Sequence, residues 1–459
     1  MRKNFILNTD SYKASHFLQY PPGTTHVSSY IEARGGDYEK AIFFGLQMFI
    51  KEYLEKPVTY DDISEAKAVM EAHGVPFNEE GWKYIVQNHN GYLPIEIQAV
   101  PEGTPVAMQN ALVQVINTDP ECAWLTSYVE TALLRSVWYP TTVATVSYSC
   151  KQSIARYLEM TADSSDGLVF KLHDFGARGA TTEEAAAIGG AAHLVNFWGT
   201  DTISGIMAAK RYYNTDMPGF SIPAAEHSTI TAWGKDGEIA AYENMLDQFS
   251  GPGKLVAVVS DSYDLWNAID NIWGDELREK VEATGGTLIV RPDSGDPVEV
   301  VTETIERLMA RFGYETNSRG YRILPACVRV IQGDGVNEES ITDILKAMET
   351  RGLSADNIAF GMGGALLQKV NRDTMQFAMK ASAAKVNGDW RDVYKDPVTD
   401  RGKRSKKGRL AVIEPEPGIY KTIPEEELGS QKNTLETVYR NGKLIREFNF
   451  EEVRENASR

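Results

Sequence analysis

The sequence predicts an α/β fold in which short parallel strands alternate with helices. Between residues 255 and 364, four apolar, β-branched runs each end in a short polar loop rich in Asp, Gly, Arg or Ser. None of these runs alternates apolar with polar side chains, which is typical of strands buried on both faces. Helical stretches separate them, and strands alternating with helices form parallel βα units. The four runs are 255–260, 287–290, 328–332 and 358–360.

The clearest of the intervening helices is predicted over Pro297 to Phe312. Asp296 is a suitable N-cap, Pro297 suits the first helical position and Glu299 suits the first turn. Gly313 follows as a stop signal. Start and stop signals at the expected spacing therefore define this helix from the sequence alone.

The polar loops are expected to share one end of the sheet. A fifth apolar run, 168–172, leads into the segment HDFGARG at 173–179 and resembles the other four. Ligands of parallel α/β folds bind at the carboxyl ends of the strands, so all five loops should line one mouth. Acids, an arginine and glycine-exposed backbone N–H groups suit a ligand that carries hydroxyls and phosphates.

The length of 459 residues favours two domains. Residues 1 to 150 have a different pattern, with helices expected over 45–54 and 61–73 and antiparallel strands within 93–118. The pattern becomes irregular again after about 380, with strand-like runs at 409–413 and 435–441. We therefore predict a composite α+β domain from 1–150 plus 381–459, and an α/β catalytic domain from 151–380.

Composition restricts the classes of partner. The net charge of −17 disfavours a general nucleic-acid binder or a surface that adheres to anionic membranes. The first sixteen residues lack the apolar centre of a signal peptide, and no apolar run is long enough to span a bilayer, so a cytoplasmic protein is expected. The three cysteines have no CxxC spacing and are expected to be reduced thiols, mostly in the core.

Several polar residues have both a structural and a functional interpretation. Asp201 precedes a helical stretch and could be a helix-start charge or a ligand contact. His227, in a loop with an acid beside it, could be structural, a base, a nucleophile or a metal ligand. The glycine-rich turn GMGGALLQ at 361–368 leads into a helix and could bind an anion. The basic segment 401–409 could be a phosphate clamp, a solvated loop or a nucleic-acid patch, and the net charge disfavours the last.

Ten collinear segments from about residue 8 onward resemble the nicotinamide phosphoribosyltransferase family. They are TDSYKASHFLQYPPGT, VWYPTTVAT, HDFGARG, HLVNFWGTDT, PAAEHSTITAWG, VVSDSYD, IVRPDSGDP, RVIQGDGV, FGMGGALLQK and KDPVTDRGKRSKKGRL. The resemblance implies a type II phosphoribosyltransferase fold, an irregular α/β barrel with a second, composite domain. It also implies a homodimer with active sites shared between subunits, and the reaction of nicotinamide with phosphoribosyl pyrophosphate in the presence of Mg²⁺.

The resemblance also implies a role for individual residues of this sequence. The pyridine ring would lie between Phe175 and Tyr12 of the partner subunit, and Arg178 and Asp201 would bind the carboxamide. The residues implied to face the ribose are Asp261, Asp293, Gly333 and Asp334, and those implied to meet the 5′-phosphate are Arg291, Gly363, Gly364 and Arg372. Arg34, Lys395 and Lys403 would face pyrophosphate from across the dimer. His227 would be phosphorylated by ATP, a co-substrate that enhances turnover, with Asp261 and Asp293 beside the reacting groups. The direct Mg²⁺ ligands stay open.

Two positions depart from the family pattern near the ring. Phe220 stands where the family often has tyrosine, and Ala257 stands in place of a serine associated with the carboxamide contact. Two alternatives are carried forward: nicotinate phosphoribosyltransferase, which shares the fold and the phosphate chemistry, and a non-catalytic binding protein. The carboxylate of Asp201 argues against the first, because it would repel a substrate carboxylate.

Overall fold

The computed structural model describes residues 4–396, 399 and 405–459. The chain divides into two compact units. One comprises Met1–Thr145, Ala208–Asp216 and Val370–Arg459, and the other comprises Val146–Met207 and Met217–Lys369. The predicted boundaries near 150 and 380 lie close to these limits, whereas the short excursion 208–216 had no signal in the sequence.

The second unit is built on a six-stranded parallel sheet. The strand order is β7-β6-β13-β12-β9-β8. The strands are β6 (Leu172–Asp174), β7 (Gly199–Thr200), β8 (Leu255–Val259), β9 (Thr287–Arg291), β12 (Val328–Gln332) and β13 (Ile358–Met362). Four of them coincide with the four predicted runs, which confirms the parallel βα units.

An extended segment joins the two edge strands of this sheet. Next to β7, the Phe220 N–H donates to the carbonyl of Trp198 at 2.7 Å, and the Thr200 N–H donates to the carbonyl of Phe220 at 2.9 Å. Next to β8, the Ala257 N–H donates to the carbonyl of Pro223 at 3.0 Å. Residues 220–224 therefore close the sheet into an irregular barrel, as the sequence resemblance implied.

The prediction of a continuous strand-like run over 168–172 was wrong. Residues Leu168–Phe170 form a 3₁₀ turn, and β6 begins only at Leu172. The carbonyls of Ser165, Gly167 and Leu168 accept the N–H groups of the turn, so these groups do not enter the ladder. The strand end at HDFGARG stands where the sequence predicted it, but the strand has only three residues.

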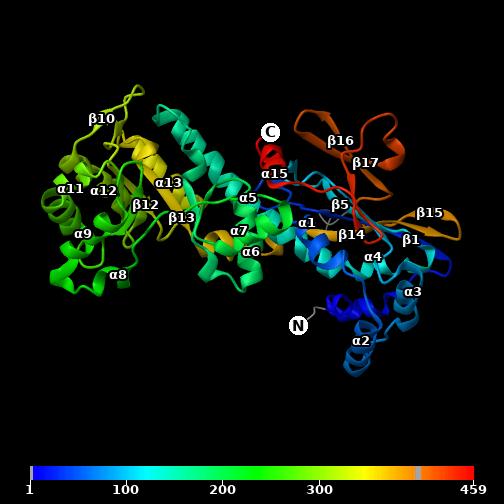
Figure 1. The fold of residues 1–459 in the computed structure, drawn as a ribbon. Coiled ribbons are helices and arrows are strands. Elements are labelled where there is room, and N and C mark those ends of the chain that lie inside the picture. The colour runs from blue at the N-terminus through cyan, green and yellow to red at the C-terminus, as the bar shows by residue number, and fades with distance from the viewer. Residues whose placement is uncertain (1–3, 397–398, 400–404) are drawn as a thin grey trace. The chain divides into compact units, whose positions relative to one another are not determined.

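Helices flank the parallel strands, and Figure 1 shows α12 and α13 near β12. The predicted helix is α12 (Pro297–Phe312), in which the Asp296 side chain accepts the N–H groups of Val298 and Glu299 and Gly313 follows the last turn. The other helices of this unit that lie wholly within it are α6 (Glu183–His193), α8 (His227–Thr231), α9 (Glu238–Phe249), α10 (Leu265–Asn267), α11 (Arg278–Ala283), α13 (Glu338–Thr350) and α14 (Gly364–Leu367). A π-helix spans Ala268–Glu276, and a small hairpin pairs β10 (Glu315–Thr316) with β11 (Arg322–Ile323).

The first unit contains a seven-stranded sheet made from both ends of the chain. Its order is β15-β14-β1-β5-β3-β18-β19. The strands are β1 (Thr24–Glu32), β3 (Ile95–Ala99), β5 (Ala111–Asn117), β14 (Ala378–Val386), β15 (Asp389–Asp392), β18 (Glu436–Arg440) and β19 (Lys443–Leu444). The pairings between these strands are antiparallel, and β1 pairs with β14 from the other end of the sequence, with Thr24 opposite Val386. This unit therefore has the composite α+β architecture that the family resemblance implied for the domain beside the barrel-like one.

The remaining elements of this unit are two small sheets and several helices. The sheets pair β2 (Lys40–Ile42) with β4 (Pro105–Ala107) and β16 (Leu410–Glu416) with β17 (Ile419–Pro424). The helices are α1 (Leu46–Phe49), α2 (Tyr60–His73), α3 (Glu79–His89), α4 (Leu125–Tyr128) and α15 (Phe450–Ala457). Two more helices, α5 (Glu130–Thr161) and α7 (Ile203–Tyr213), continue past the unit boundary along the chain. Among the described residues, no helix combines the length and the apolar character needed to cross a membrane. Cys122 and Cys150 are buried, and Cys327 is partly buried.

Candidate active site

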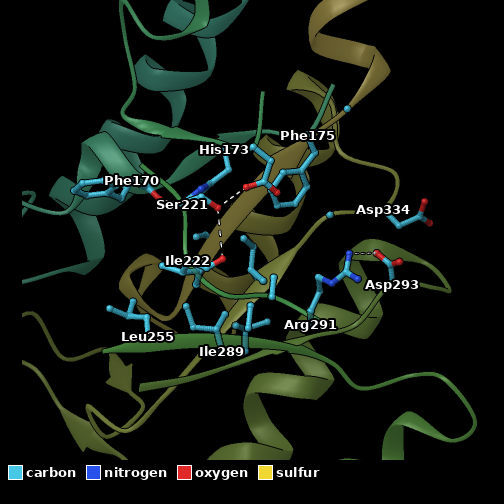
Figure 2. Close-up of a pocket in the computed structure, with 18 of the residues that line it drawn as sticks. Phe170, His173, Phe175, Ser221, Ile222, Leu255, Ile289, Arg291, Asp293 and Asp334 are labelled. Carbon is cyan, nitrogen blue, oxygen red and sulfur yellow. Dashed lines mark hydrogen bonds and ion pairs between the residues drawn. The ribbon is translucent and has the colours of Figure 1, made fainter. Parts of the chain in front are cut away.

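A cavity of about 1180 Å³ is lined by residues at both ends of the parallel strands, including the residues that follow the carboxyl ends of β6, β7, β9, β12 and β13. Its apolar wall is a cluster of Ala257, Ile289 and Ile331, against which Phe175, Ile222 and Ala359 pack. In Figure 2, Phe175, His173 and Ser221 form one group of labelled side chains, and Arg291, Asp293 and Asp334 form another. Four of the five predicted loops therefore line one cavity within one unit of the chain. The loop after β8 does not line it, although its Asp261 contacts Asp293 and His227.

The aromatic side of the cavity is set by a close approach between Phe175 and β13. Gly361 in β13 leaves room for the ring: a Cβ added there would lie 1.9 Å from Phe175 Cε2. The Phe175 N–H donates to the carbonyl of Met362 at 3.0 Å, which ties the start of the loop to the same strand. Phe175 thus presents a ring to the cavity from a position that only glycine opposite it allows.

Asp201 lies at the end of β7 and lines the same cavity. Its Oδ1 accepts a hydrogen bond from the Ser221 hydroxyl, on the segment that closes the barrel. The Asp201 side chain is therefore oriented by a cavity residue, and its other oxygen, Oδ2, makes no hydrogen bond to a described residue. The interpretation of Asp201 as only a helix-start charge does not account for this contact. Beside it, burial lowers the pKa of His173, although the Asp201 charge opposes the shift.

The sequence analysis placed His227 in a loop. In the structure His227 is instead the first residue of the short helix α8. Its Nε2 lies 3.3 Å from Asp293 Oδ2 and 3.8 Å from Asp261 Oδ1, and its Nδ1 lies 3.2 Å from the Ser262 hydroxyl. The side chain of His227 is 47% exposed, whereas that of Asp261 is 5% exposed. Because carboxylates only accept hydrogen bonds, Nε2 is the nitrogen expected to carry the proton in the resting protein.

Arg291 and Asp293 line the polar side of the cavity, and Asp261 contacts Asp293 without lining the cavity itself. The Asp261 carboxylate accepts the Asp293 N–H at 3.1 Å, and Arg291 Nη1 pairs with Asp293 Oδ1 at 3.3 Å. Burial raises the pKa of Asp293 and the Asp261 charge adds to this, whereas Arg291 opposes the shift. The arrangement therefore concentrates negative charge that a cationic group would stabilise.

The glycine-rich loops of β12 and β13 complete this side. Gly333 and Asp334 follow β12, and Gly363 and Gly364 follow β13, and all four line the cavity. The helix expected after GMGG is only the single turn α14. Arg178, on the 3₁₀ turn Ala177–Gly179, also lines the cavity and is exposed.

The remaining predicted site residues do not belong to this unit. Tyr12, Arg34, Arg372 and Lys395 lie in the first unit, and Lys403 lies outside the described residues. The Tyr12 side chain is 58% exposed, Arg34 donates to the carbonyl of Gln376 at 3.3 Å, and Arg372 pairs with Asp373 at 3.2 Å. The predicted residues that line the cavity are Phe175, Arg178, Asp201, His227, Arg291, Asp293, Gly333, Asp334, Gly363 and Gly364, and Asp261 does not line it.

Sequence reasoning missed two serines that orient the predicted residues. Ser221 bonds Asp201, and Ser262 approaches His227. Ser262 stands in the segment VVSDSYD and Ser221 directly follows Phe220, but a serine in a polar loop carries no signal for the partner it will meet. Glu226, the acid beside His227 in the sequence, accepts the Ser228 hydroxyl.

The carboxylates of Asp261 and Asp293 suit Mg²⁺, an ion that proteins often bind together with a phosphate-containing substrate. Asp261 Oδ1 is buried and has no hydrogen-bond partner among the described residues, and Asp293 lies beside it. No group of three or more His, Cys, Asp or Glu side chains with metal-binding geometry occurs in the described part of the chain. Mg²⁺ commonly uses one or two carboxylates and completes its shell with water and substrate phosphates, so two carboxylates suffice.

Comparison with known proteins identifies the family. A model of the nicotinate phosphoribosyltransferase (NAPRTase) family matches residues 170–443, and a model of the nicotinamide phosphoribosyltransferase N-terminal domain matches residues 4–97. A nicotinamide phosphoribosyltransferase of Xanthomonas campestris pv. campestris (strain 8004) is 54% identical over 99% of this chain and 98% of its own length. One of Acinetobacter baylyi is 32% identical over 99% of this chain and 97% of its own.

Solved structures share the fold at low sequence identity. A nicotinate-nucleotide pyrophosphorylase from Pyrococcus furiosus aligns with a TM-score of 0.64 at 18% identity, over 99% of this chain and 94% of that one. Human nicotinic acid phosphoribosyltransferase aligns with a TM-score of 0.58 at 15% identity, over 98% and 92%. These two likenesses establish the type II phosphoribosyltransferase fold, and the sequence identity along the whole chain is more specific. The chain belongs to the nicotinamide phosphoribosyltransferase family.

Proposed function

We propose that this protein transfers the 5-phosphoribosyl group from phosphoribosyl pyrophosphate to nicotinamide, giving nicotinamide mononucleotide and pyrophosphate. The observation that supports this most directly is that the aromatic ring of Phe175 and the carboxylate of Asp201 line one side of the cavity. The other side of the cavity carries Arg291 and the glycine-rich loops. A flat, neutral amide fits the first side, and a phosphorylated sugar fits the second. The family relationship supports the same reaction.

The transfer requires placement more than covalent chemistry by the protein. The pyridine nitrogen forms a bond to the anomeric carbon while the bond from that carbon to pyrophosphate breaks, and positive charge develops on the sugar. Phe175 would hold the ring, and Asp261, Asp293 and Asp334 would face the sugar. Mg²⁺ bound there would neutralise pyrophosphate oxygens that these carboxylates would otherwise repel. Arg291 and the Gly363–Gly364 backbone would meet the 5′-phosphate.

Asp201 favours nicotinamide over nicotinate, the alternative substrate. One Asp201 oxygen accepts from Ser221, so the other can accept an N–H of the carboxamide. A substrate carboxylate about 4 Å away would be repelled by about 4 kcal/mol at an effective dielectric constant of about 20. This corresponds to nearly a thousandfold in affinity at about 1.4 kcal/mol per tenfold.

The direct test supplies phosphoribosyl pyrophosphate and Mg²⁺ with either nicotinamide or nicotinic acid and detects the mononucleotide by mass. Product from nicotinamide supports the proposal, and product only from nicotinic acid supports the alternative enzyme. Absence of both, with tight binding of either substrate, would indicate a non-catalytic binding protein.

Replacing Asp201 with Asn should raise the ratio of nicotinate to nicotinamide turnover. The change removes the like charge and keeps the shape, and because the free carboxylate is exposed and screened we expect an increase of about ten- to a hundredfold. Competition between the two substrates, with both products measured, gives the ratio. Asp236→Asn, an exposed change in the same unit outside the cavity, is the control. An unchanged ratio would leave Asp201 as a structural residue.

We further propose that ATP phosphorylates His227 and that the protein is a homodimer with shared sites. The Asp261 and Asp293 carboxylates face Nε2, so a proton held there leaves the Nδ1 lone pair as the phosphoryl acceptor. The γ-phosphoryl group would leave ADP, bond to the imidazole and pass to water as inorganic phosphate. The exposed Tyr12 would supply the second face for the ring of the neighbouring copy, together with the cations Arg34, Lys395 and Lys403.

Mixing two inactive variants tests the shared site. Tyr12→Ala and Phe175→Ala homodimers should both be weak, whereas mixed dimers should contain one intact site each. At equal mixing about half of the dimers are mixed, so activity should return to about a quarter of wild type by the two-fold symmetry of such dimers. Subunit exchange is verified by native mass spectrometry. Exchange without recovery of activity would contradict a site built from both copies.

A further inference from the structure

The chain around Lys395 is fixed to the large antiparallel sheet of the first unit by contacts that the mechanism above does not use. Val393 and Gly408 each donate their N–H to the carbonyl of Ser382 in β14 at 2.8 Å. The Lys395 N–H donates to the Ser405 hydroxyl at 3.0 Å, and the Ser405 N–H donates to the Lys395 carbonyl at 3.1 Å. The two chain segments are therefore bonded to each other and to one strand.

A buried ion pair continues this attachment to β1. Lys406, next to Ser405, pairs through its ammonium group with the Glu32 carboxylate. The Lys406 N–H donates to the Tyr30 hydroxyl at 2.9 Å, and the ammonium lies 5.5 Å from the centre of the Tyr30 ring. The Glu32 side chain is 4% exposed, and Tyr30 is fully buried. Lys406 is thus held by two alternate residues of one strand, whose side chains share a face of the sheet.

Three other cations lie near this ion pair, and no carboxylate of a described residue forms an ion pair with them. Lys380 is directly opposite Tyr30 in the pairing of β1 with β14, so their side chains are on the same face. Arg34 lies just beyond the end of β1, and Lys395 is the third cation. Burial lowers the pKa of Lys380, and the charges of Lys395 and Arg34 lower it further. Positive charge is therefore concentrated where an anion would be stabilised.

The ion pair determines which cations are available to an anionic ligand. Glu32 is a buried acid on this face of the sheet, and a buried carboxylate is costly without a cation. Without Lys406, the Glu32 charge would attract the neighbouring cations instead. By pairing with Glu32, Lys406 leaves the charge of Lys395 for a ligand. Through Ser405 it also fixes the backbone at Lys395.

We propose that Tyr30, Glu32 and Lys406 form a clamp that positions Lys395 for the pyrophosphate group of phosphoribosyl pyrophosphate and keeps the Glu32 charge from neutralising that site. This inference rests on the proposed function, in which Lys395 faces pyrophosphate. It assigns binding of the leaving group in part to three residues that do not touch it. It predicts that the clamp acts on phosphoribosyl pyrophosphate and pyrophosphate, and not on nicotinamide.

The test compares Glu32→Gln and Lys406→Met, which break the ion pair, with Lys406→Arg, which keeps the positive charge. In the first two variants, the KM for phosphoribosyl pyrophosphate and the inhibition constant of added pyrophosphate should rise about tenfold, the usual scale for losing a hydrogen bond between charged groups. The KM for nicotinamide should stay within about twofold of wild type. Lys406→Arg should keep all three constants within about threefold, because a guanidinium group also pairs with a carboxylate.

A double variant separates positioning from stability. Each single change leaves one charge of a buried pair without its partner, so both should lower the thermal midpoint. Glu32→Gln combined with Lys406→Met removes both charges and should recover most of the midpoint. Its KM for phosphoribosyl pyrophosphate should nevertheless stay about tenfold above wild type, because the clamp is still missing. Recovery of this KM together with the midpoint would show that the ion pair acts through stability alone.

A second comparison asks whether the clamp acts through Lys395. Lys395→Ala should itself raise the KM for phosphoribosyl pyrophosphate, and adding Glu32→Gln should have little further effect, because both changes remove the same positioned charge. Full additivity of the two effects would contradict a role through Lys395. Glu96→Gln is the matched control, since Glu96 is a buried acid of β3 in the same sheet and pairs with Arg440. This control should leave both KM values unchanged.

Calorimetric binding of inorganic pyrophosphate with Mg²⁺ requires no turnover, so it separates the inference from the proposed function. Failure of wild type to form nicotinamide mononucleotide overturns the function, and weaker pyrophosphate binding by Glu32→Gln than by Glu96→Gln would still support the clamp. If Glu32→Gln and Glu96→Gln bind pyrophosphate equally well and have the same KM for phosphoribosyl pyrophosphate, then the ion pair is merely structural and the inference is wrong. Lys406→Met provides the same comparison if Glu32→Gln fails to fold.

Discussion

In His227→Ala, ATP hydrolysis should fall to background while a slow, ATP-independent synthesis of nicotinamide mononucleotide continues. His227 is the nitrogen nucleophile proposed for the phosphoryl group, and its side chain is exposed to the cavity beside Asp261 and Asp293. Removal of the imidazole removes the covalent route entirely, so we expect a loss of at least about a hundredfold in ATPase rate. Transfer of the sugar to the pyridine needs no covalent histidine, so that step should survive.

The measurement combines ATPase rate, mass detection of the acid-labile phosphohistidine, and mononucleotide formation with and without ATP. His73→Ala, at an exposed position in the last turn of α2, is the control and should retain ATPase activity. Wild-type ATPase activity persisting in His227→Ala would show that the phosphoryl group is accepted elsewhere. Loss of the mononucleotide even at high substrate would show that the imidazole itself takes part in the transfer.

In Gly361→Ala, the affinity for nicotinamide should fall by at least about tenfold. The three atoms nearest to the added Cβ all belong to the Phe175 ring, at 1.9, 2.2 and 2.7 Å. The ring must therefore leave the position in which it faces the cavity. Loss of one aromatic face costs a bound ring about 0.5–1.5 kcal/mol beyond the lost burial, which together exceeds the 1.4 kcal/mol of a tenfold change.

A double variant separates the steric effect from general damage to β13. Gly361→Ala should lower the thermal midpoint, and combining it with Phe175→Ala should add little to the cost of Phe175→Ala alone, because the colliding ring is then absent. Gly167→Ala is the control, since its added Cβ would meet nothing closer than Lys171 at 4.0 Å. If the decreases in thermal midpoint of the two single variants add fully in the double variant, then something other than the Phe175 ring resists the added methyl group.

Local signals in the sequence were sufficient for the elements that carry the loops. The runs at 255, 287, 328 and 358 became β8, β9, β12 and β13 because an apolar, β-branched run flanked by helices has few ways to bury both faces. Helix α12 has the predicted limits because its cap, its proline and its terminal glycine act within a few residues of one another. The common mouth followed from these, since parallel strands place their ends at one edge.

Features that depend on distant pairing could not be derived in this way. Residues 220–224 close the barrel through isolated bridges to Gly199 and Ala257, and such single contacts leave no periodic pattern. The run at 168–172 became a 3₁₀ turn followed by a three-residue strand because its carbonyls accept local N–H groups. Propensity alone does not distinguish these outcomes.

The sequence by itself determined the fold class, the loops that carry the chemistry and, through the family resemblance, the residues Phe175, Asp201, His227 and Arg291 that the cavity brings together. Only the tertiary structure decided how these residues are oriented: Ser221 bonds Asp201, Ser262 lies beside His227, and Gly361 lies opposite Phe175. The physical reason is the separation along the chain over which each kind of interaction acts. Strand and helix signals arise between near neighbours in the chain, whereas each orienting contact joins residues that only the closed barrel brings within hydrogen-bonding or van der Waals distance.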